Sequence, residues 1–501
     1  MANPAVRGEH APDHEVIIIG GGFSGIGAAI KLDEIGMRDY LLVEQGDGIG
    51  GAWHFNTYPG VAVDIPSLSY SFSFERNPEW SRVFAPGKEL KAYAEHCVDK
   101  YGLRSRIRLN TGIRAARFDD ASSLWHLTTE AGETLTARFV IGATGVLTQP
   151  KLPDIPGIAS FRGTTMHTAR WDHGVDLRGK RVAIIGTGAS ALQVIPEIAP
   201  EVAHLTVFQR TPIWVLPKPD AAIPGAVQQV MKRLPWLQLP ARLASQAFVE
   251  TTFVLAAHYY RQLRIVKAFE PVALKHLENQ VRDPVTRAKL TPRYGLGCKR
   301  PSVSNTYLKT FNRDNVALVT EGITGIVPEG VRTADGVLHA IDILICATGF
   351  KVFESGNMPP FQVTGSQGRD LESWWDAERY QAYEGVSMPG FPNFFLILGP
   401  NGYNGASYFQ LIEQQVRHIT RCLKQARTRK ARRVEVTREA NDRYFRDMKA
   451  RSGSQVFFNN GCASANSYYF DKHGDVPFRP ATSLEAHWRS MTFDLNDYVY
   501  R

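Results

Sequence analysis

The sequence is poor in cysteine and contains no long apolar run. Its five cysteines are widely separated and none belongs to a C-x-x-C pair; they are Cys97, Cys298, Cys346, Cys422 and Cys462. This spacing argues against a zinc site, a redox disulfide or a disulfide scaffold, and it fits a reducing compartment. No stretch of about 18 apolar residues is present, and the first residues, MANPAVRGEHAPDHE, lack the apolar core of a signal peptide. We therefore expect a cytoplasmic protein with no metal site and no stable membrane insertion.

The chain is basic, with a formal net charge of +9 and a pI near 9.2. No basic run is interleaved with aromatic residues, so nucleic acid is not an expected partner. The densest basic cluster, residues 424–433, is typical of a solvated helix end. The excess positive charge also suits a site that holds the phosphates of anionic cofactors. The apolar stretch 248–260 is interrupted by polar residues, and a buried helix is favoured there over a membrane-surface helix.

The sequence contains two pairs of segments, and the two members of each pair share a pattern. Residues 15–32 (EVIIIGGGFSGIGAAIKL) and 181–198 (RVAIIGTGASALQVIPEI) each begin with a β-branched run, pass a glycine-rich turn and continue with helical periodicity. Residues 138–145 and 342–350 are apolar strands that end in Ala-Thr-Gly. Because each member of the first pair starts a βαβ unit, we predict an α/β fold with two Rossmann-like dinucleotide-binding domains.

The order of these segments predicts a nested arrangement. We expect one dinucleotide-binding domain over residues 1–148 and 351–501, and a second over 149–221 and 299–350. Residues 222–298 carry few strand patterns and long helical ones, such as 243–269 and 272–290, and are predicted to be a helical insertion in the second domain.

The first glycine motif predicts an FAD site. Gly20, Gly22 and Gly25 lie between a strand and a helix, where they allow a tight turn, close approach of the backbone to a pyrophosphate, and close helix packing. The helix N-terminus offers unpaired N–H groups to the phosphates. The next strand ends in Glu44, 19 residues after Gly25, which is placed to accept hydrogen bonds from ribose hydroxyls.

The second glycine motif, Gly186-x-Gly188-x-x-Ala191, predicts an NADPH site. The strand that follows it carries no acid at its end, where Arg210 and Thr211 stand instead. An acid would repel a 2′-phosphate, whereas an arginine pairs with it, so NADPH is favoured over NADH.

Two dinucleotide sites in one chain indicate hydride transfer from NADPH to a flavin. Flavoprotein disulfide reductases share this plan, but they need a reactive cysteine pair, and the spacing of the cysteines suggests none here. The simplest remaining acceptor for the electrons of the reduced flavin is O2.

Two further motifs resemble the type I Baeyer–Villiger monooxygenases of the class B flavoprotein monooxygenase family. FRGTTMHTARWD (161–172) matches the fingerprint F-x-G-x-x-x-H-x-x-x-W-[DP], and GGAWHFNTYPGVAVD (50–64) matches G-x-W-x-x-x-x-[FY]-P-G-x-x-x-D. Residues 298–319 are similar to the family segment that carries the active-site arginine. The resemblance covers about residues 15–420. It implies that NADPH and O2 convert a ketone into an ester or lactone through a flavin C4a-peroxide.

The resemblance also implies roles for individual residues. Arg300 matches the active-site arginine, and Asp64 matches its carboxylate partner, so these two are the expected catalytic residues. The peroxide and the adduct that it forms with the ketone are anionic. A permanent cation suits their stabilisation because burial does not neutralise arginine. Three groups are expected at the cofactors: Lys299 beside the NADPH phosphate, Gly51 in the type I motif, and Trp53 and Tyr58 as walls of the flavin site. His167 is expected to have a conformational role in an interdomain linker.

Some alternatives stay open. The last 80 residues match less well: SYY (467–469) and FRP (478–480) stand where many relatives carry tryptophans, and the aromatic residues in 456–470 either line a pocket or form plain core. The main rival function is oxygenation of sulfur or nitrogen in small substrates. A flavin-binding redox sensor that never oxygenates is a minor alternative. We expect a small ketone and O2 as partners, and a monomer or weak dimer.

Overall fold

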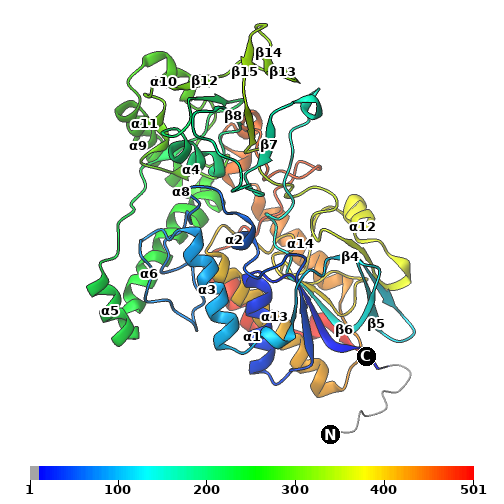
Figure 1. Ribbon diagram of the computed structural model, residues 1–501. Helices are drawn as coiled ribbons and strands as arrows, with labels where there is room; N and C mark the ends of the chain where they lie inside the picture. The colour runs from blue at the N-terminus through cyan, green and yellow to red at the C-terminus, as the bar shows by residue number, and fades with distance from the viewer. Residues whose placement is uncertain (1–10) are drawn as a thin grey trace.

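The protein forms two mainly parallel β-sheets, each flanked by helices, with a group of helices at one side (Figure 1). The structure is a computed structural model that describes residues 11–501, so most of the N-terminal stretch compared above with a signal peptide lies outside the described residues. In that part of the chain, no helix is long and apolar enough to cross a membrane. The architecture is the α/β class predicted from the repeated strand–turn–helix pattern.

The first sheet has the order β17-β4-β5-β6-β1-β2-β3, and β18 also pairs with β6. β1 lies between two parallel neighbours, and its residues Val16, Ile17 and Ile18 have no exposed surface, which explains the continuous apolar run. The strands are β1 (His14–Ile19), β2 (Tyr40–Val43), β3 (Ile107–Arg108), β4 (Ile113–Asp119), β5 (Leu124–Thr129), β6 (Thr134–Gly142), β17 (Gln362–Thr364) and β18 (Phe394–Leu396). The chain thus returns to this sheet after residue 350.

Helices from both ends of the chain pack around the first sheet; α1 and α13, for example, lie against each other. The helices are α1 (Phe23–Glu34), α2 (Ala52–Phe55), α3 (Gly87–Lys100), α12 (Leu371–Glu378), α13 (Tyr408–Arg429), α14 (Arg438–Ser452) and α15 (Ser483–Thr492). A two-stranded ladder of β19 (Val434–Val436) and β20 (Tyr498–Tyr500) ties down the C-terminus.

The second sheet has the order β12-β9-β8-β16-β7, all parallel. Its strands are β7 (Thr164–His167), β8 (Arg181–Ile185), β9 (His204–Phe208), β12 (Val316–Val319) and β16 (Ile343–Cys346), and its helices are α4 (Ala189–Ile198) and α11 (Tyr307–Thr310). Smaller sheets are formed by β10 (Val215–Leu216) with β11 (Ser302–Val303), and by β13 (Ile323–Val327), β14 (Gly330–Thr333) and β15 (Leu338–Ala340). The exact domain boundaries at 148, 221, 298 and 350 stay a prediction.

Residues 222–298 are helical but more broken than their periodicity indicates. The elements are α5 (Gly225–Arg233), α6 (Gln238–Val249), the π-helical turn η4 (Glu250–Leu255), α7 (Ala256–His258), α8 (Tyr260–Leu263), α9 (Ile265–Gln280) and α10 (Pro284–Leu290). The single helix expected over 243–269 is therefore wrong. The π-helical turn and the left-handed conformation of Arg264, with φ of 48°, interrupt it. In Figure 1, α5 and α6 lie at one margin of the molecule, away from α10.

Candidate active site

The turn between β1 and α1 forms a backbone cradle. Gly20 has a φ of +113°, and a Cβ there would lie 2.6 Å from the Ala143 carbonyl oxygen, while a Cβ at Gly25 would lie 2.0 Å from the Gly20 carbonyl oxygen. Only glycine fits either position. Gly22 is the N-cap of α1, where no side chain caps the helix and no acid occupies the first turn. The first amides of α1 thus stay free for an anion such as a pyrophosphate.

Glu44 lies beside this cradle, directly after β2, and is buried. Its two carboxylate oxygens accept hydrogen bonds from the backbone amides of Gly21 (2.6 Å) and Gly46 (2.8 Å). These bonds fix the carboxylate at the mouth of the turn, and each oxygen keeps a further lone pair for a hydroxyl donor. Binding of a ribose there stays a prediction.

The turn between β8 and α4 has the same features, a glycine turn followed by a helix N-terminus without a side-chain cap. Gly186 has a φ of +111°, and the α4 N-cap Gly188 again has no side-chain cap and no acid in the following turn. A Cβ at Gly188 would meet no atom within 4 Å, so the turn is open to a ligand. Ala191 is fully buried against the sheet and sets the close helix packing.

Two cations meet beside the second turn. Arg210 follows β9, and Lys299 comes from the far end of the insertion; neither makes an ion pair with another residue of the described chain. Burial and the charge of Arg210 lower the pKa of Lys299 to about 8. Thr211 lies next to them, where its carbonyl oxygen accepts a hydrogen bond from Thr187 within the turn. Two adjacent, uncompensated cations are the arrangement that a phosphate group neutralises.

Arg300 and Asp64 form a two-point ion pair. Nε and Nη2 of Arg300 donate to the two carboxylate oxygens of Asp64 at 2.6 and 3.0 Å. Nη1 donates to the hydroxyl of Tyr403 at 3.3 Å, and the ring of Phe253 lies 5.0 Å from the guanidinium carbon. The pair is partly buried, and three side chains from distant parts of the sequence hold the guanidinium in one orientation.

The environment of Arg300 keeps it charged. Burial is the largest single influence and acts to lower the pKa of Arg300. The charge of Asp64, its hydrogen bond and the nearby Tyr403 and Tyr469 together outweigh it, and the pKa stands well above its ordinary value. Burial raises the pKa of Tyr469 well above its usual range, which keeps this nearby hydroxyl protonated. The site therefore presents a permanent cation with neutral hydroxyl groups around it.

The type I motif links the first turn to the second sheet's helix. Gly51 packs on the turn, because a Cβ there would lie 3.0 Å from Cα of Gly22. Trp53 is partly buried and makes an edge contact with Tyr70 at 5.8 Å. Tyr58 is instead buried against α4, where its hydroxyl donates to the side chain of Gln193 at 2.9 Å. Tyr58 thus connects the two parts of the structure, and its contact with a flavin stays a prediction.

The sequence predicts His167 in an interdomain linker, and this prediction is wrong. His167 is the last residue of β7, at the edge of the second sheet, and it is buried. Its Nδ1 accepts a hydrogen bond from the Ala169 amide, and its buried Nε2 makes no hydrogen bond with the described residues. Burial lowers its pKa, so the ring is neutral at pH 7.

The cysteines are not all free, although their spacing argues against a redox disulfide and a disulfide scaffold. Cys298 and Cys462, 164 residues apart, form a disulfide. Spacing excluded only local motifs and said nothing about cysteines that the fold brings together. The bond joins the residue before Lys299 to the C-terminal segment, and Asn466 in that segment donates to Thr211 at 3.2 Å. The C-terminal segment is therefore fixed to the two-cation site at two points.

The aromatic residues of 456–470 lie on the Arg300 side of the structure. Tyr468 and Tyr469 are in contact with each other, and both are close enough to Arg300 for its charge to act on their pKa. Tyr469 also contacts Phe457 and Phe478. The sequence could not decide between core and pocket lining here; the nearness to Arg300 favours lining.

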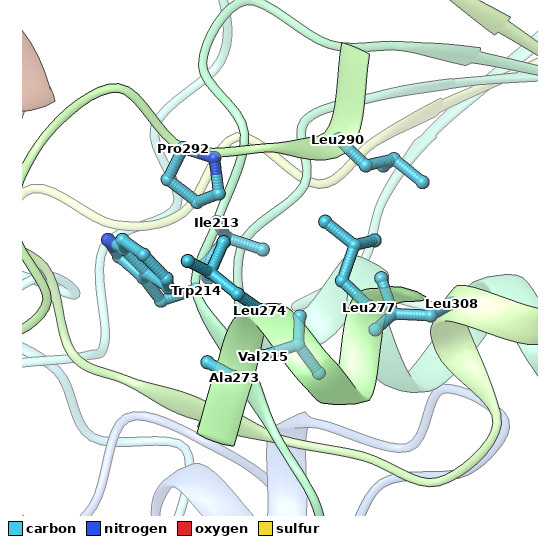
Figure 2. Close-up of a pocket in the computed structure, with 9 residues that line it drawn as sticks. All are labelled: Ile213, Trp214, Val215, Ala273, Leu274, Leu277, Leu290, Pro292 and Leu308. Atoms are coloured by element: carbon cyan, nitrogen blue, oxygen red, sulfur yellow. The ribbon is translucent and has the colours of Figure 1, made fainter. Parts of the chain in front are cut away.

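A small apolar pocket lies elsewhere, between the insertion and the second sheet (Figure 2). It has a volume of about 10 Å³ and is lined by Ile213, Trp214, Val215, Ala273, Leu274, Leu277, Leu290, Pro292 and Leu308. Such a volume holds roughly one water molecule and the lining is apolar, so the pocket is a packing gap and not a cofactor site.

The comparisons with known proteins decide the family. A family model described as pyridine nucleotide-disulphide oxidoreductase matches residues 17–236. A Baeyer–Villiger monooxygenase of Pseudomonas aeruginosa is 40% identical over 90% of this chain and 84% of its own length. A Baeyer–Villiger monooxygenase of Streptomyces coelicolor is 38% identical over 98% of this chain and 94% of its own. The chain belongs to the Baeyer–Villiger monooxygenase family.

The structure agrees with this assignment. A crystal structure of OTEMO in complex with FAD and NADP matches with a TM-score of 0.86 and 29% identity, covering 98% of this chain and 100% of that one. The family motifs match Arg300 to the active-site arginine and Asp64 to its carboxylate partner, and these two residues form an ion pair in this structure. The family and the fold class predicted from the motifs are thus confirmed.

The disulfide does not make this member of the family a disulfide reductase. Both cysteines are buried, Cys298 completely and Cys462 to 5% exposure, so a thiol substrate has no access to the sulfur atoms. A redox-active pair needs an exposed sulfur with thiolate character. The bond here is a structural link between two segments.

Proposed function

We propose that the protein uses NADPH, FAD and O2 to convert a ketone into an ester or lactone. In the overall reaction one oxygen atom enters between the carbonyl carbon and a neighbouring carbon, the other leaves as water, and NADPH with a proton supplies the two electrons. The family assignment and the FAD and NADP bound to the similar OTEMO structure support this proposal. The observation that carries the chemistry is the fixed, charged Arg300.

The residues of both turns fit the two cofactors. The Gly20–Gly22 turn and α1 would hold the pyrophosphate of FAD, and Glu44 its ribose. The Gly186–Gly188 turn and α4 would hold the NADPH pyrophosphate. When bound, FAD accepts the hydride of NADPH and activates O2. The proposed division into an FAD domain, an NADP domain and a helical insertion follows from this placement.

Arg210 and Lys299 would bind the 2′-phosphate of NADPH. Their joint positive charge lacks an ion-pair partner among the described residues, and burial together with the charge of Arg210 lowers the pKa of Lys299. A phosphate between them removes that repulsion, whereas NADH brings no such charge. This explains a preference for NADPH.

Arg300 would stabilise the negative charge that develops on oxygen during insertion. A fixed cation in a partly buried site acts without reorganisation, and donors of this kind contribute roughly 3–4 kcal/mol to a barrier. Asp64 is a positioning residue: it holds the guanidinium at two points. Nη1 donates to the Tyr403 hydroxyl and not to Asp64, so it is the guanidinium nitrogen that we assign to the reacting oxygen.

We further propose a lipophilic ketone as the substrate. Arg300 is surrounded by Phe253, Tyr403, Tyr468 and Tyr469, and aromatic side chains of this kind favour an apolar ligand with one polar group. The cytoplasmic location and the monomeric or weakly dimeric state stay predictions. Disulfides are rare in a reducing cytoplasm, so the redox state of Cys298 and Cys462 in the cell is the measurement that bears on the location.

The test is turnover with a panel of substrates. FAD-loaded protein is incubated with NADPH in air and with linear, cyclic and aryl ketones, or with sulfides and amines, and products are identified by mass spectrometry. Esters or lactones from ketones support the proposal. Sulfoxides or hydroxylamines without any ester would favour oxygenation of sulfur or nitrogen.

A further inference from the structure

The helical insertion exposes an unusual number of large apolar side chains. We call this set the insertion patch; it comprises Val227 and Val230 of α5, Leu234 directly after α5, Trp236 of the following turn, and Leu239, Leu243 and Phe248 of α6, each at least 43% exposed. The helical spacing places Val227, Val230 and Leu234 on one face, and Leu239 and Leu243 on another, while Phe248 is exposed farther round α6. In Figure 1, α5 and α6 lie at the margin of the molecule, with no other labelled element on their outer side.

The polarity of α6 is the reverse of that expected for a helix in water. Its buried residues include Gln238, Arg242 and Ser245, while its leucines and Phe248 face outwards. Arg242 donates to the Leu68 carbonyl oxygen and to Ser71 at 2.9–3.0 Å, and Ser245 bonds to Ser69 at 2.8 Å. These buried polar contacts fix the orientation of α6. The apolar face is thus held outward by the fold, and it is suited to an apolar environment.

The charge around the patch is positive. Residues 221–249 contain two lysine or arginine side chains on the surface, Lys232 and Arg233, and no aspartate or glutamate. Lys232 pairs with Glu79 at 2.8 Å, but Arg233 makes no ion pair with the described residues. Arg76 adds a further cation, since its guanidinium reaches the Pro235 carbonyl oxygen next to Trp236.

This charge distinguishes the possible occupants of the patch. A second copy of the chain, packed about a two-fold axis, would bring the same cations face to face. A bilayer that contains anionic lipid attracts them and accepts the apolar side chains. Tryptophan suits the boundary between acyl chains and headgroups.

We propose that the insertion patch docks the protein on the surface of a bilayer containing anionic lipid. The outward face of α5 and α6 enters the interface with Trp236, and Arg76 and Arg233 contact the lipid headgroups. The contact is peripheral. It does not depend on the proposed activity, so its test does not need turnover.

The patch is also connected to the substrate side. α6 continues directly into η4, which carries Phe253, and the ring of Phe253 lies 5.0 Å from the Arg300 guanidinium. In a docked protein, α6 would therefore connect the lipid surface to the aromatic residues around Arg300. Such a location suits a substrate that partitions into a bilayer.

The test measures binding of the FAD-loaded full chain to vesicles. Phosphatidylcholine vesicles are compared with vesicles that also contain phosphatidylglycerol, by co-sedimentation and by tryptophan fluorescence. We expect binding to the anionic vesicles, weakened by salt. The triple variant Trp236→Ser, Leu239→Ser and Leu243→Ser should bind at least about tenfold more weakly. Changing Arg76→Gln or Arg233→Gln should weaken binding by about fivefold each.

A matched control separates the patch from general hydrophobicity. Val285→Ser with Leu338→Ser removes two aliphatic side chains that are 63% and 40% exposed but lie on α10 and β15, away from the patch. This variant should bind like the unchanged protein, and the triple variant should keep its thermal stability.

Two results would overturn the proposal. The first is that the unchanged protein binds neither kind of vesicle, or that the triple variant binds as well as the unchanged protein. The second is that light scattering finds a dimer that the triple variant abolishes while vesicles capture neither protein, which would make the patch an interface between copies.

Discussion

Arg300 donates two hydrogen bonds to Asp64, a residue 236 positions earlier in the chain, at 2.6 and 3.0 Å. The contact joins the type I motif, which packs on the first glycine turn through Gly51, to the segment that follows the insertion. It places a permanent positive charge beside Phe253 of the insertion and the Tyr403 hydroxyl. The chemistry proposed for the protein depends on this pair.

Arg300→Ala should separate NADPH consumption from oxygen insertion. Hydride transfer needs the nicotinamide placed over the flavin, whereas insertion needs stabilisation of negative charge on oxygen. We expect the variant to consume NADPH in air and release hydrogen peroxide, while ester formation falls by roughly 100-fold or more. Asp64→Ala should show a milder loss. The measurement is ester formed per NADPH oxidised, with anaerobic flavin reduction as the control; an unchanged ratio in Arg300→Ala would assign insertion to another residue.

Arg210→Ala should weaken NADPH selectively. Loss of one charge-assisted contact with the 2′-phosphate should reduce the apparent affinity for NADPH by roughly 10–100-fold, with little effect on NADH. Steady-state KM values for both nucleotides measure this. Equal weakening of the two would show that Arg210 has a structural role.

NADPH binding should depend on pH through Lys299. Burial and Arg210 lower the pKa of Lys299 to about 8 in the free protein, and a bound phosphate raises it, so binding takes up a proton. Affinity should therefore be constant below pH 8 and fall as the pH rises above it, by up to about tenfold per pH unit.

Two controls identify the titrating group. NADH carries no 2′-phosphate and should show a flat profile. Lys299→Arg keeps its charge at every pH in this range, and it should flatten the NADPH profile. A profile that still falls above pH 8 in Lys299→Arg would exclude Lys299 as its origin. Isothermal titration in two buffers of different ionisation enthalpy reports the proton uptake directly.

The disulfide between Cys298 and Cys462 should contribute to stability. A cross-link across 164 residues restricts the unfolded chain, and loop entropy gives an upper value of roughly 5 kcal/mol. Reductant should lower the melting temperature of the unchanged protein, but not that of the double variant Cys298→Ser, Cys462→Ser. Thiol titration after unfolding without reductant should find the three free cysteines, Cys97, Cys346 and Cys422. Five titratable thiols would show that the bond does not form.

Much of the fold follows from local patterns. A β-branched run, a glycine turn and a helical period specify a βαβ start from adjacent residues alone, so Gly20 and Gly186 both occupy the predicted turns. Arg300 and Asp64 were paired through the family motifs, and the geometry agrees with that pairing.

Other features depend on contacts between distant segments. The helical period continues through residues 250–264, and it is the packing of η4 and the following turn that interrupts the helix. The Cys298–Cys462 bond has no local pattern, because only the folded chain brings the two residues together. Tyr403 beside Arg300, and Asn466 beside Thr211, were missed for the same reason.

The most direct test of the proposed activity is incorporation of labelled oxygen. FAD-loaded protein is supplied with NADPH, a ketone that it accepts, and O2 labelled with heavy oxygen, and the product is analysed by mass spectrometry. The account predicts an ester or lactone that carries one labelled atom, in the ring or chain position next to the former carbonyl carbon, with the carbonyl oxygen unlabelled. NADPH consumption without any labelled ester, across ketones of every class, would contradict it.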